Sequence, residues 1–238
     1  MADTIAGQTH IEPDGGALAS YVALWLAEHI AASAGPFRLS LSGGSTPKAL
    51  YSLLAQEPYG SRVEWEKVEF YFGDERFVPH DHPDSNFRMA NEALLSHIAG
   101  AQVYPMPTDT SVEDCAVRYG SLMKQRYGAA AFDPARPFFD VMLLGLGDDG
   151  HTASLIPGQP VLEERTKWVA PVLHGRDEQR ITLTYPALES SRTIAFLVTG
   201  AGKAQTVARV RGGDNALPAA RIQPHGAVMW FLDSAAAG

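Results

Sequence analysis

Short, almost uninterrupted apolar runs recur along this chain, and segments with the apolar spacing of a helix separate most of them. Residues 37–41, 68–72 and 139–144 are such runs. Strands that are apolar throughout are typical of a sheet buried on both faces. Because parallel strands need crossover connections, which are usually helices, the alternation predicts an α/β fold. We expect a mainly parallel, twisted sheet flanked by helices on both faces.

The remaining segments give the rest of the expected map. Helices are expected at 16–34, 45–56, 86–98, 111–126 and 201–211, and further strands at 168–173, 180–185, 193–198 and 227–232. The hydroxyls of Ser45 and Thr46 are expected to cap the second helix. Because residues 168–198 leave little room for helices, we expect an antiparallel edge there.

Length, charge and cysteine content narrow the class of protein. The chain has 238 residues, which suits one domain, 1–238, with a large core. Its formal charge of −8 provides no basic surface for nucleic acid, so an anionic ligand has to be attracted by a few local cations. There is no apolar run long enough for a membrane span, and residues 1–15 lack the pattern of a signal peptide. With a single cysteine, Cys115, these features predict a cytoplasmic protein that binds neither nucleic acid nor membrane.

Four chemically rich stretches each come directly after an expected strand. They are SGGST (42–46), GDER (73–76), GLGDDGH (145–151) and GAGK (200–203). The carboxyl ends of parallel strands lie on one edge of a sheet, and ligands bind there where the strand order switches. We therefore expect the four stretches to converge on one site.

The first stretch suits a phosphate group. Small residues before a helix N-terminus let backbone N–H groups approach an anion, and the helix dipole favours negative charge. The candidate ligands are Gly43, Gly44, Ser45 and Thr46. An ordinary tight turn is the alternative interpretation. The stretch matches neither the P-loop nor the serine-nucleophile pattern, which argues against NTP binding and against a catalytic serine.

Two cations are candidates for the same phosphate. Lys203 stands at the expected start of a helix, where a positive charge is unfavourable for the helix itself, and this suggests that it serves a ligand. Arg180 begins an expected strand and either joins Lys203 or is a surface arginine.

The GDER stretch places acids and a guanidinium beside the same edge. Arg76 can form paired hydrogen bonds to an oxyanion, and Asp74 can orient it or handle protons. A structural ion pair is the alternative. His80 and His82 follow, but two histidines in a loop rich in Pro and Asp indicate a solvated loop better than a metal site, so we expect no metal.

The GLGDDGH stretch formally fits the GxGxxG dinucleotide pattern. Asp148 and Asp149 would put two negative charges where a pyrophosphate should lie, and Pro157 leaves little room for the helix that the pattern requires. The glycines are better explained as a sharp turn that displays His151. Imidazole, whose ordinary pKa is about 6.5, can take a proton from water at neutral pH, and Asp149 could fix its tautomer. A histidine that merely packs in the turn is the alternative.

Taken together, these stretches resemble the 6-phosphogluconolactonase family. The matching segments are LSGGSTPKALY (41–51), FGDERFVPHDHPDSNFRMA (72–90), DVMLLGLGDDGHTASLIPG (140–158), RITLTYPAL (180–188), FLVTGAGKA (196–204) and WFLDSAAA (230–237). The resemblance implies a Rossmann-like fold similar to that of glucosamine-6-phosphate deaminase. It also implies cofactor-independent hydrolysis of 6-phospho-D-glucono-1,5-lactone to 6-phospho-D-gluconate, the second step of the pentose phosphate pathway.

The resemblance also suggests roles for the candidate residues. His151 would activate water, assisted by Asp74 and Arg76, and the other candidates would bind the phosphate of a phosphosugar lactone: Gly43, Gly44, Ser45, Thr46, Arg180 and Lys203. We expect no cofactor, and a monomer or a weak homo-oligomer.

Two other functions remain open at this stage. In the related deaminases the DGH sequence is typically followed by Ile-Ala-Phe-Asn-Glu, whereas here Thr-Ala-Ser-Leu follows. A deaminase or isomerase would want that missing acid. A non-catalytic sugar-phosphate sensor would be expected to carry a DNA-binding segment and would need no base at the sheet edge.

Overall fold

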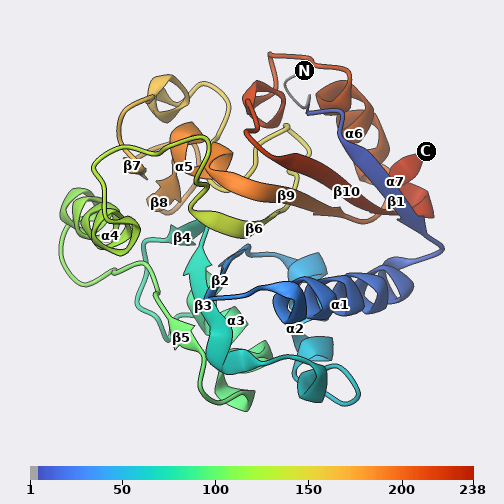
Figure 1. Cartoon of the computed structure of the whole chain (residues 1–238). Helices are drawn as coiled ribbons and strands as arrows, with labels where there is room; N and C mark the ends of the chain where they lie inside the picture. The colour runs from blue at the N-terminus through green and yellow to red at the C-terminus, as the bar shows by residue number, and fades with distance from the viewer. Residues whose placement is uncertain (1–4) are drawn as a thin grey trace.

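The computed structural model describes residues 5–238. Residues 1–4 belong to the segment 1–15, which was expected to lack a signal peptide, and they lie outside the described residues. Within the described part, seven parallel strands form the main sheet in the order β1-β10-β9-β6-β2-β3-β5 (Figure 1). Their bounds are β1 Gln8–Glu12, β2 Phe37–Leu41, β3 Val68–Phe72, β5 Gln102–Val103, β6 Phe139–Leu144, β9 Ser191–Val198 and β10 Ala227–Asp233. The predicted parallel α/β fold is confirmed, and β2, β3 and β6 have the predicted bounds.

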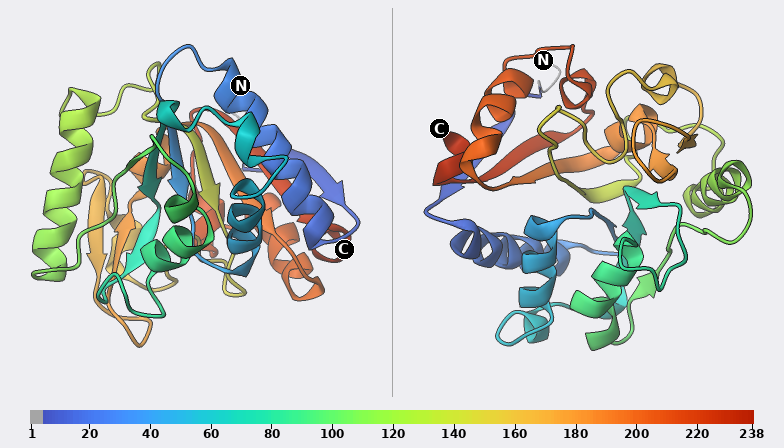
Figure 2. Two further views of the ribbon diagram at one scale, coloured as in Figure 1. Left: turned by 90° about the horizontal axis from the view of Figure 1, so that it is seen from below. Right: turned by 180° about the vertical axis from the view of Figure 1, so that it is seen from behind.

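Helices cover both sides of this sheet. On one side lie α1 (Gly15–Ala32), α2 (Ser45–Leu54) and α3 (Asn86–Ala93), and on the other lie α5 (Tyr185–Glu189) and α6 (Ala204–Arg211) (Figures 1 and 2). The last helix is α7 (Ser234–Ala237). The start of α1 is set by Asp14, whose carboxylate accepts hydrogen bonds from the N–H groups of Gly16 and Ala17.

The strand order reverses between β2 and β6. From β2 the chain continues outward to β3 and β5, whereas from β6, the neighbour of β2, it continues the other way to β9 and β10. The pairing of Leu39 with Val141 and of Ser40 with Met142 places the two strands side by side. The stretches 42–46 and 145–151 leave the carboxyl ends of these two strands, so both lie at the switch point where α/β sheets bind ligands.

A second, antiparallel sheet adjoins the end of β3. It consists of β4 (Asp74–Arg76), β8 (Arg180–Leu183) and β7 (Val169–Val172), and α4 (Val112–Tyr127) packs against β7 and β8. The antiparallel region is therefore a separate sheet rather than an edge of the main one. Residues 74–76, expected in a loop, form a strand because β8 pairs with them. The strand expected at 180–185 ends at Leu183 because Tyr185 and Pro186 begin α5.

The expected hydroxyl cap of α2 is wrong. The N-cap is Gly44, with φ of 107°, and Ser45 is already the first helical residue. The hydroxyl of Thr46 hydrogen-bonds that of Thr199 at 2.8 Å instead. A glycine cap has no side chain to accept from the first N–H groups of the helix, and no side-chain cap hydrogen bond forms there.

Two expected helices are shorter than predicted. The segment 86–98 is helical as α3 only to Ala93, and a 3₁₀ turn follows at Leu95–His97. The segment 201–211 begins with a 3₁₀ turn at Ala201–Lys203 and becomes α6 at Ala204. Lys203 therefore stands immediately before α6, close to the first-turn position that the sequence predicted for it.

Candidate active site

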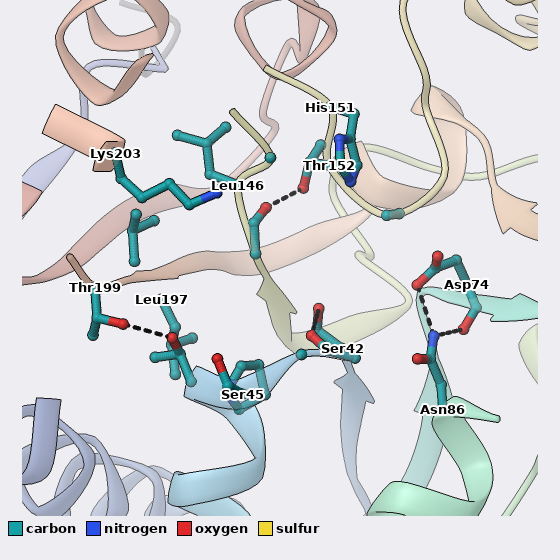
Figure 3. Close-up of a pocket in the computed structure, with 18 of the residues that line it drawn as sticks. Ser42, Ser45, Asp74, Asn86, Leu146, His151, Thr152, Leu197, Thr199 and Lys203 are labelled. Carbon is teal, nitrogen blue, oxygen red and sulfur yellow. Dashed lines mark hydrogen bonds between the residues drawn. The ribbon is translucent and has the colours of Figure 1, made fainter. Parts of the chain in front are cut away.

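A pocket of about 310 Å³ opens at the switch point of the main sheet, next to the small sheet (Figure 3). All four predicted stretches contribute to its wall, so their expected convergence is confirmed. The structure brings every predicted site residue to this wall: Gly43, Gly44, Ser45, Thr46, Asp74, Arg76, His151, Arg180 and Lys203.

A buried tyrosine, Tyr51, fixes the start of the turn 42–46 through two hydrogen bonds. The Tyr51 hydroxyl donates to the carbonyl of Ser42 and accepts from the N–H of the same residue, both at 2.9 Å. Burial raises the pKa of Tyr51, so this hydroxyl stays protonated and keeps both bonds. The first turn of α2 is thus presented to the pocket in a fixed orientation.

Gly43 is required by the close approach of Asn86. A Cβ atom at position 43 would lie 2.1 Å from the Asn86 side-chain oxygen. We therefore expect Gly43→Ala to push Asn86 out of place, to reduce activity and to destabilise the fold by roughly 1–3 kcal/mol, as overpacking does. Thermal unfolding and an activity assay measure both effects. Gly35→Ala is a matched control, because no described atom lies within 4 Å of its added methyl group. Equal behaviour of the two variants would show that the Gly43–Asn86 contact is not tight.

His151 is oriented by the acid two residues before it. Its Nδ1 lies 2.5 Å from Oδ1 of Asp149, and Oδ2 of Asp149 accepts a hydrogen bond from Arg176 at 2.8 Å. Burial acts to raise the pKa of Asp149, but the bonds from Arg176 and His151 outweigh it and hold that pKa well below its usual range. An ionised Asp149 favours a proton on Nδ1, which leaves Nε2 as the basic nitrogen.

Arg176 was not singled out in the sequence. It lies in the connection between β7 and β8, 25 residues after His151, and its guanidinium is also 3.1 Å from Nδ1 of His151. No motif marks it, since only the folded loop brings it to Asp149.

Asp74 is buried, with 6% of its surface exposed, and is fully engaged by neighbours. Oδ2 accepts from the Ser154 hydroxyl at 2.6 Å, and Oδ1 accepts from the side-chain amide of Asn86 at 3.2 Å. The Asn86 oxygen in turn accepts from NH1 of Arg76 at 3.0 Å. Asp74 and Arg76 share no direct hydrogen bond, and the hydrogen bonds that link them run through Asn86. Asn86 lies within the matched segment 72–90, yet nothing in the sequence indicated this bridging position.

Glu75 anchors the chain on either side of this bridge. Its buried carboxylate accepts hydrogen bonds from the N–H groups of Arg76, Asn86 and Phe87 and from the Ser85 hydroxyl. Burial raises the pKa of Glu75, and the hydrogen bonds oppose that rise. The carboxylate therefore joins β4 to the N-terminus of α3 and fixes the backbone of two residues that line the pocket.

The two arginines of the site face each other across the small sheet. Arg76 of β4 pairs in register with Arg180 of β8, an arrangement that places like charges opposite each other and is destabilising by itself. Two carboxylates offset this repulsion. Glu178 is 2.5 Å from Arg180 and 3.9 Å from Arg76, and Asp74 is 4.0 Å from Arg180. The Nε atoms of both arginines are buried and have no hydrogen-bond partner among residues 5–238. The donors left for an anion are instead NH2 of Arg76 and NH1 of Arg180, which no hydrogen bond among the described residues uses.

Other kinds of site find less support in the described part of the chain. No group of three or more His, Cys, Asp or Glu side chains there could hold a metal ion. Thr152 and Leu155, which follow His151, form an isolated antiparallel bridge, so this turn does not lead into the helix that a dinucleotide site requires. No helix among residues 5–238 is long and apolar enough to cross a membrane.

Comparison with known proteins agrees with this geometry. Residues 13–230 match the family model described as glucosamine-6-phosphate isomerases/6-phosphogluconolactonase. The 6-phosphogluconolactonase of Homo sapiens is 41% identical, with 94% of this chain and 88% of that protein covered. A probable chloroplastic 6-phosphogluconolactonase 3 of Oryza sativa subsp. japonica is 40% identical, with 92% of this chain and 70% of that protein covered.

Solved structures give the same result. The devB protein superposes with a TM-score of 0.87 at 33% identity, with 97% of this chain and 98% of that chain covered. The 6-phosphogluconolactonase of Trypanosoma brucei superposes with a TM-score of 0.80 at 31% identity, with 97% of each chain covered. A monomeric glucosamine-6-phosphate deaminase shares the fold at 21% identity. The chain therefore belongs to the family of glucosamine-6-phosphate isomerases and 6-phosphogluconolactonases.

Proposed function

We propose that this chain hydrolyses 6-phospho-D-glucono-1,5-lactone to 6-phospho-D-gluconate. The observation that carries the proposal is that one pocket holds both a carboxylate-bound imidazole and a helix N-terminus flanked by the cations Lys203 and Arg180. Relatives about 40% identical over most of the chain are named 6-phosphogluconolactonases, which supports the same reaction.

The phosphate would bind at the first turn of α2. The N–H groups that follow the Gly44 cap, the dipole of α2 and the small residues Gly43, Ser45 and Thr46 provide a neutral cradle for an anion. Lys203 and Arg180 would supply the positive charge. Binding energy from this remote group would position the lactone carbonyl near His151.

His151 would act as the general base. Its Nε2 takes a proton from a water molecule as the water oxygen attacks the lactone carbonyl, and Asp149 stabilises the resulting imidazolium through Nδ1. Arg76 and backbone N–H groups stabilise the tetrahedral oxyanion. When the intermediate collapses, the bond from the carbonyl carbon to the ring oxygen breaks, and His151 returns its proton to that oxygen. Asp74 would contribute by holding Asn86, and through it Arg76.

A deaminase or isomerase reaction is the second candidate, because the family includes such enzymes. The residues after His151 count against it. Where the deaminases typically carry an acid, this chain has Ile156, which is buried in the core beside Leu155. A carboxylate for proton transfer is therefore missing from that position.

A lactone hydrolysis assay at controlled pH, corrected for spontaneous ring opening, tests the proposal. We expect acceleration of lactone opening by the chain and no release of ammonia from glucosamine 6-phosphate. Ammonia release with no lactone hydrolysis would establish the deaminase instead. If the chain binds the lactone or glucosamine 6-phosphate but converts neither, the result would establish a sugar-phosphate sensor.

A further inference from the structure

The hydrolytic mechanism leaves one of the two neighbouring aspartates unused. Asp149 contacts His151, whereas Oδ1 of Asp148 lies 2.5 Å from Nζ of Lys203. A second interaction fixes the backbone of Asp148, because the Thr206 hydroxyl of α6 donates to the carbonyl of Asp148 at 3.0 Å. The backbone bond to α6 thus keeps the carboxylate within reach of Lys203.

We propose that Asp148 is an internal competitor of the substrate phosphate for Lys203. The inference rests on the proposed function, in which Lys203 binds that phosphate. In the free enzyme the carboxylate neutralises the lysine, and on binding the phosphate takes its place. Asp148 therefore lowers the affinity for the phosphate end of both substrate and product and leaves the reacting end untouched.

The exposure of the two partners supports displacement rather than a permanent bond. The Asp148 side chain is 84% exposed, so it returns to water at little cost when it leaves Lys203. The Lys203 side chain is only 27% exposed and lines the pocket, so it remains in place for the incoming anion. A phosphate that carries about two negative charges at neutral pH attracts the ammonium group more strongly than one carboxylate does.

Removing the charge of Asp148 should therefore increase affinity, which general damage to the fold does not do. We expect Asp148→Asn to lower both the KM for the lactone and the inhibition constant of inorganic phosphate by about 2- to 5-fold, the range for an exposed ion pair. Both effects should shrink as ionic strength rises. Steady-state kinetics with inorganic phosphate as the competing ligand measure them.

Glu64→Gln is a matched control. Glu64 forms a comparable exposed pair with Lys67, at 2.8 Å, on a 3₁₀ turn before β3 and outside the pocket. Glu64→Gln removes one negative charge, as Asp148→Asn does, so it reports any effect of the change in net charge alone. We expect its KM and phosphate inhibition to equal those of the parent chain.

A double-mutant cycle with Lys203→Ala tests whether the effect passes through the lysine. In the Lys203→Ala background, Asp148→Asn should change phosphate affinity less than about 1.5-fold. Unchanged or weaker phosphate binding by Asp148→Asn in the parent background would overturn the proposal, as would an equal gain in both backgrounds. Calorimetric titration of inorganic phosphate gives the same comparison without turnover, so a failure of the lactonase proposal would be seen separately.

Discussion

Replacement of His151 by alanine is expected to lower kcat by about 10²- to 10⁴-fold, with KM nearly unchanged. The imidazole is the group of the pocket wall that combines a basic nitrogen with an oriented partner, since Asp149 holds Nδ1 at 2.5 Å. The residues proposed to bind the phosphate lie on other elements, so substrate binding should survive the change. Initial rates over a range of lactone concentrations, corrected for spontaneous hydrolysis, separate kcat from KM.

His97→Ala provides the control for this experiment. His97 lies in the 3₁₀ turn after α3, hydrogen-bonded to the carbonyl of Glu92, and does not line the pocket. Its loss should leave the rate unchanged. Asp149→Ala should give a smaller fall than His151→Ala, because the base remains but loses its orientation. Activity of His151→Ala within a few-fold of the parent chain would exclude His151 as the base.

The convergence of the site could be predicted from the sequence because one physical rule governs it. Apolar strands such as 37–41 and 139–144 identify themselves by composition, and parallel pairing then places the residues that follow them on the same edge. This rule locates His151, Lys203 and the turn 42–46 at the edge of the sheet. It needs only the positions of the strands and no knowledge of side-chain contacts.

The parts that escaped prediction depend on contacts between distant segments. Residues 74–76 are a strand only because β8, more than 100 positions later, pairs with them. The same pairing brings Arg76 opposite Arg180, which no local pattern indicates. Asn86, Arg176 and Glu178 act through hydrogen bonds or ion pairs whose partners lie on other elements. The Gly44 cap was missed because the neighbouring hydroxyls of Ser45 and Thr46 offered a more usual cap.

Arg76 lies where a guanidinium can serve either the oxyanion or the phosphate of the substrate. Arg76→Ala is expected to lower kcat by about 10²- to 10³-fold, the usual cost of losing one donor to an oxyanion. The guanidinium is held by Asn86 and by the carbonyl of Asp84, at 3.0 and 2.8 Å, and both bonds use NH1. No hydrogen bond among residues 5–238 uses NH2, so this nitrogen of the partly exposed side chain remains for a ligand.

Whether Arg76→Ala changes kcat or KM distinguishes these two functions. If Arg76 stabilises the oxyanion, kcat falls and KM changes little, whereas a phosphate ligand would raise KM and leave kcat nearly intact. Arg180→Ala should show the second pattern. Arg76→Lys should recover only part of the rate, since an ammonium group lacks the planar fork of a guanidinium. Arg88→Ala removes an exposed arginine of α3 that pairs with Glu92 outside the pocket, and it should change neither constant. A rise in KM alone for Arg76→Ala would move Arg76 from the reacting end of the pocket to the phosphate end, beside Arg180.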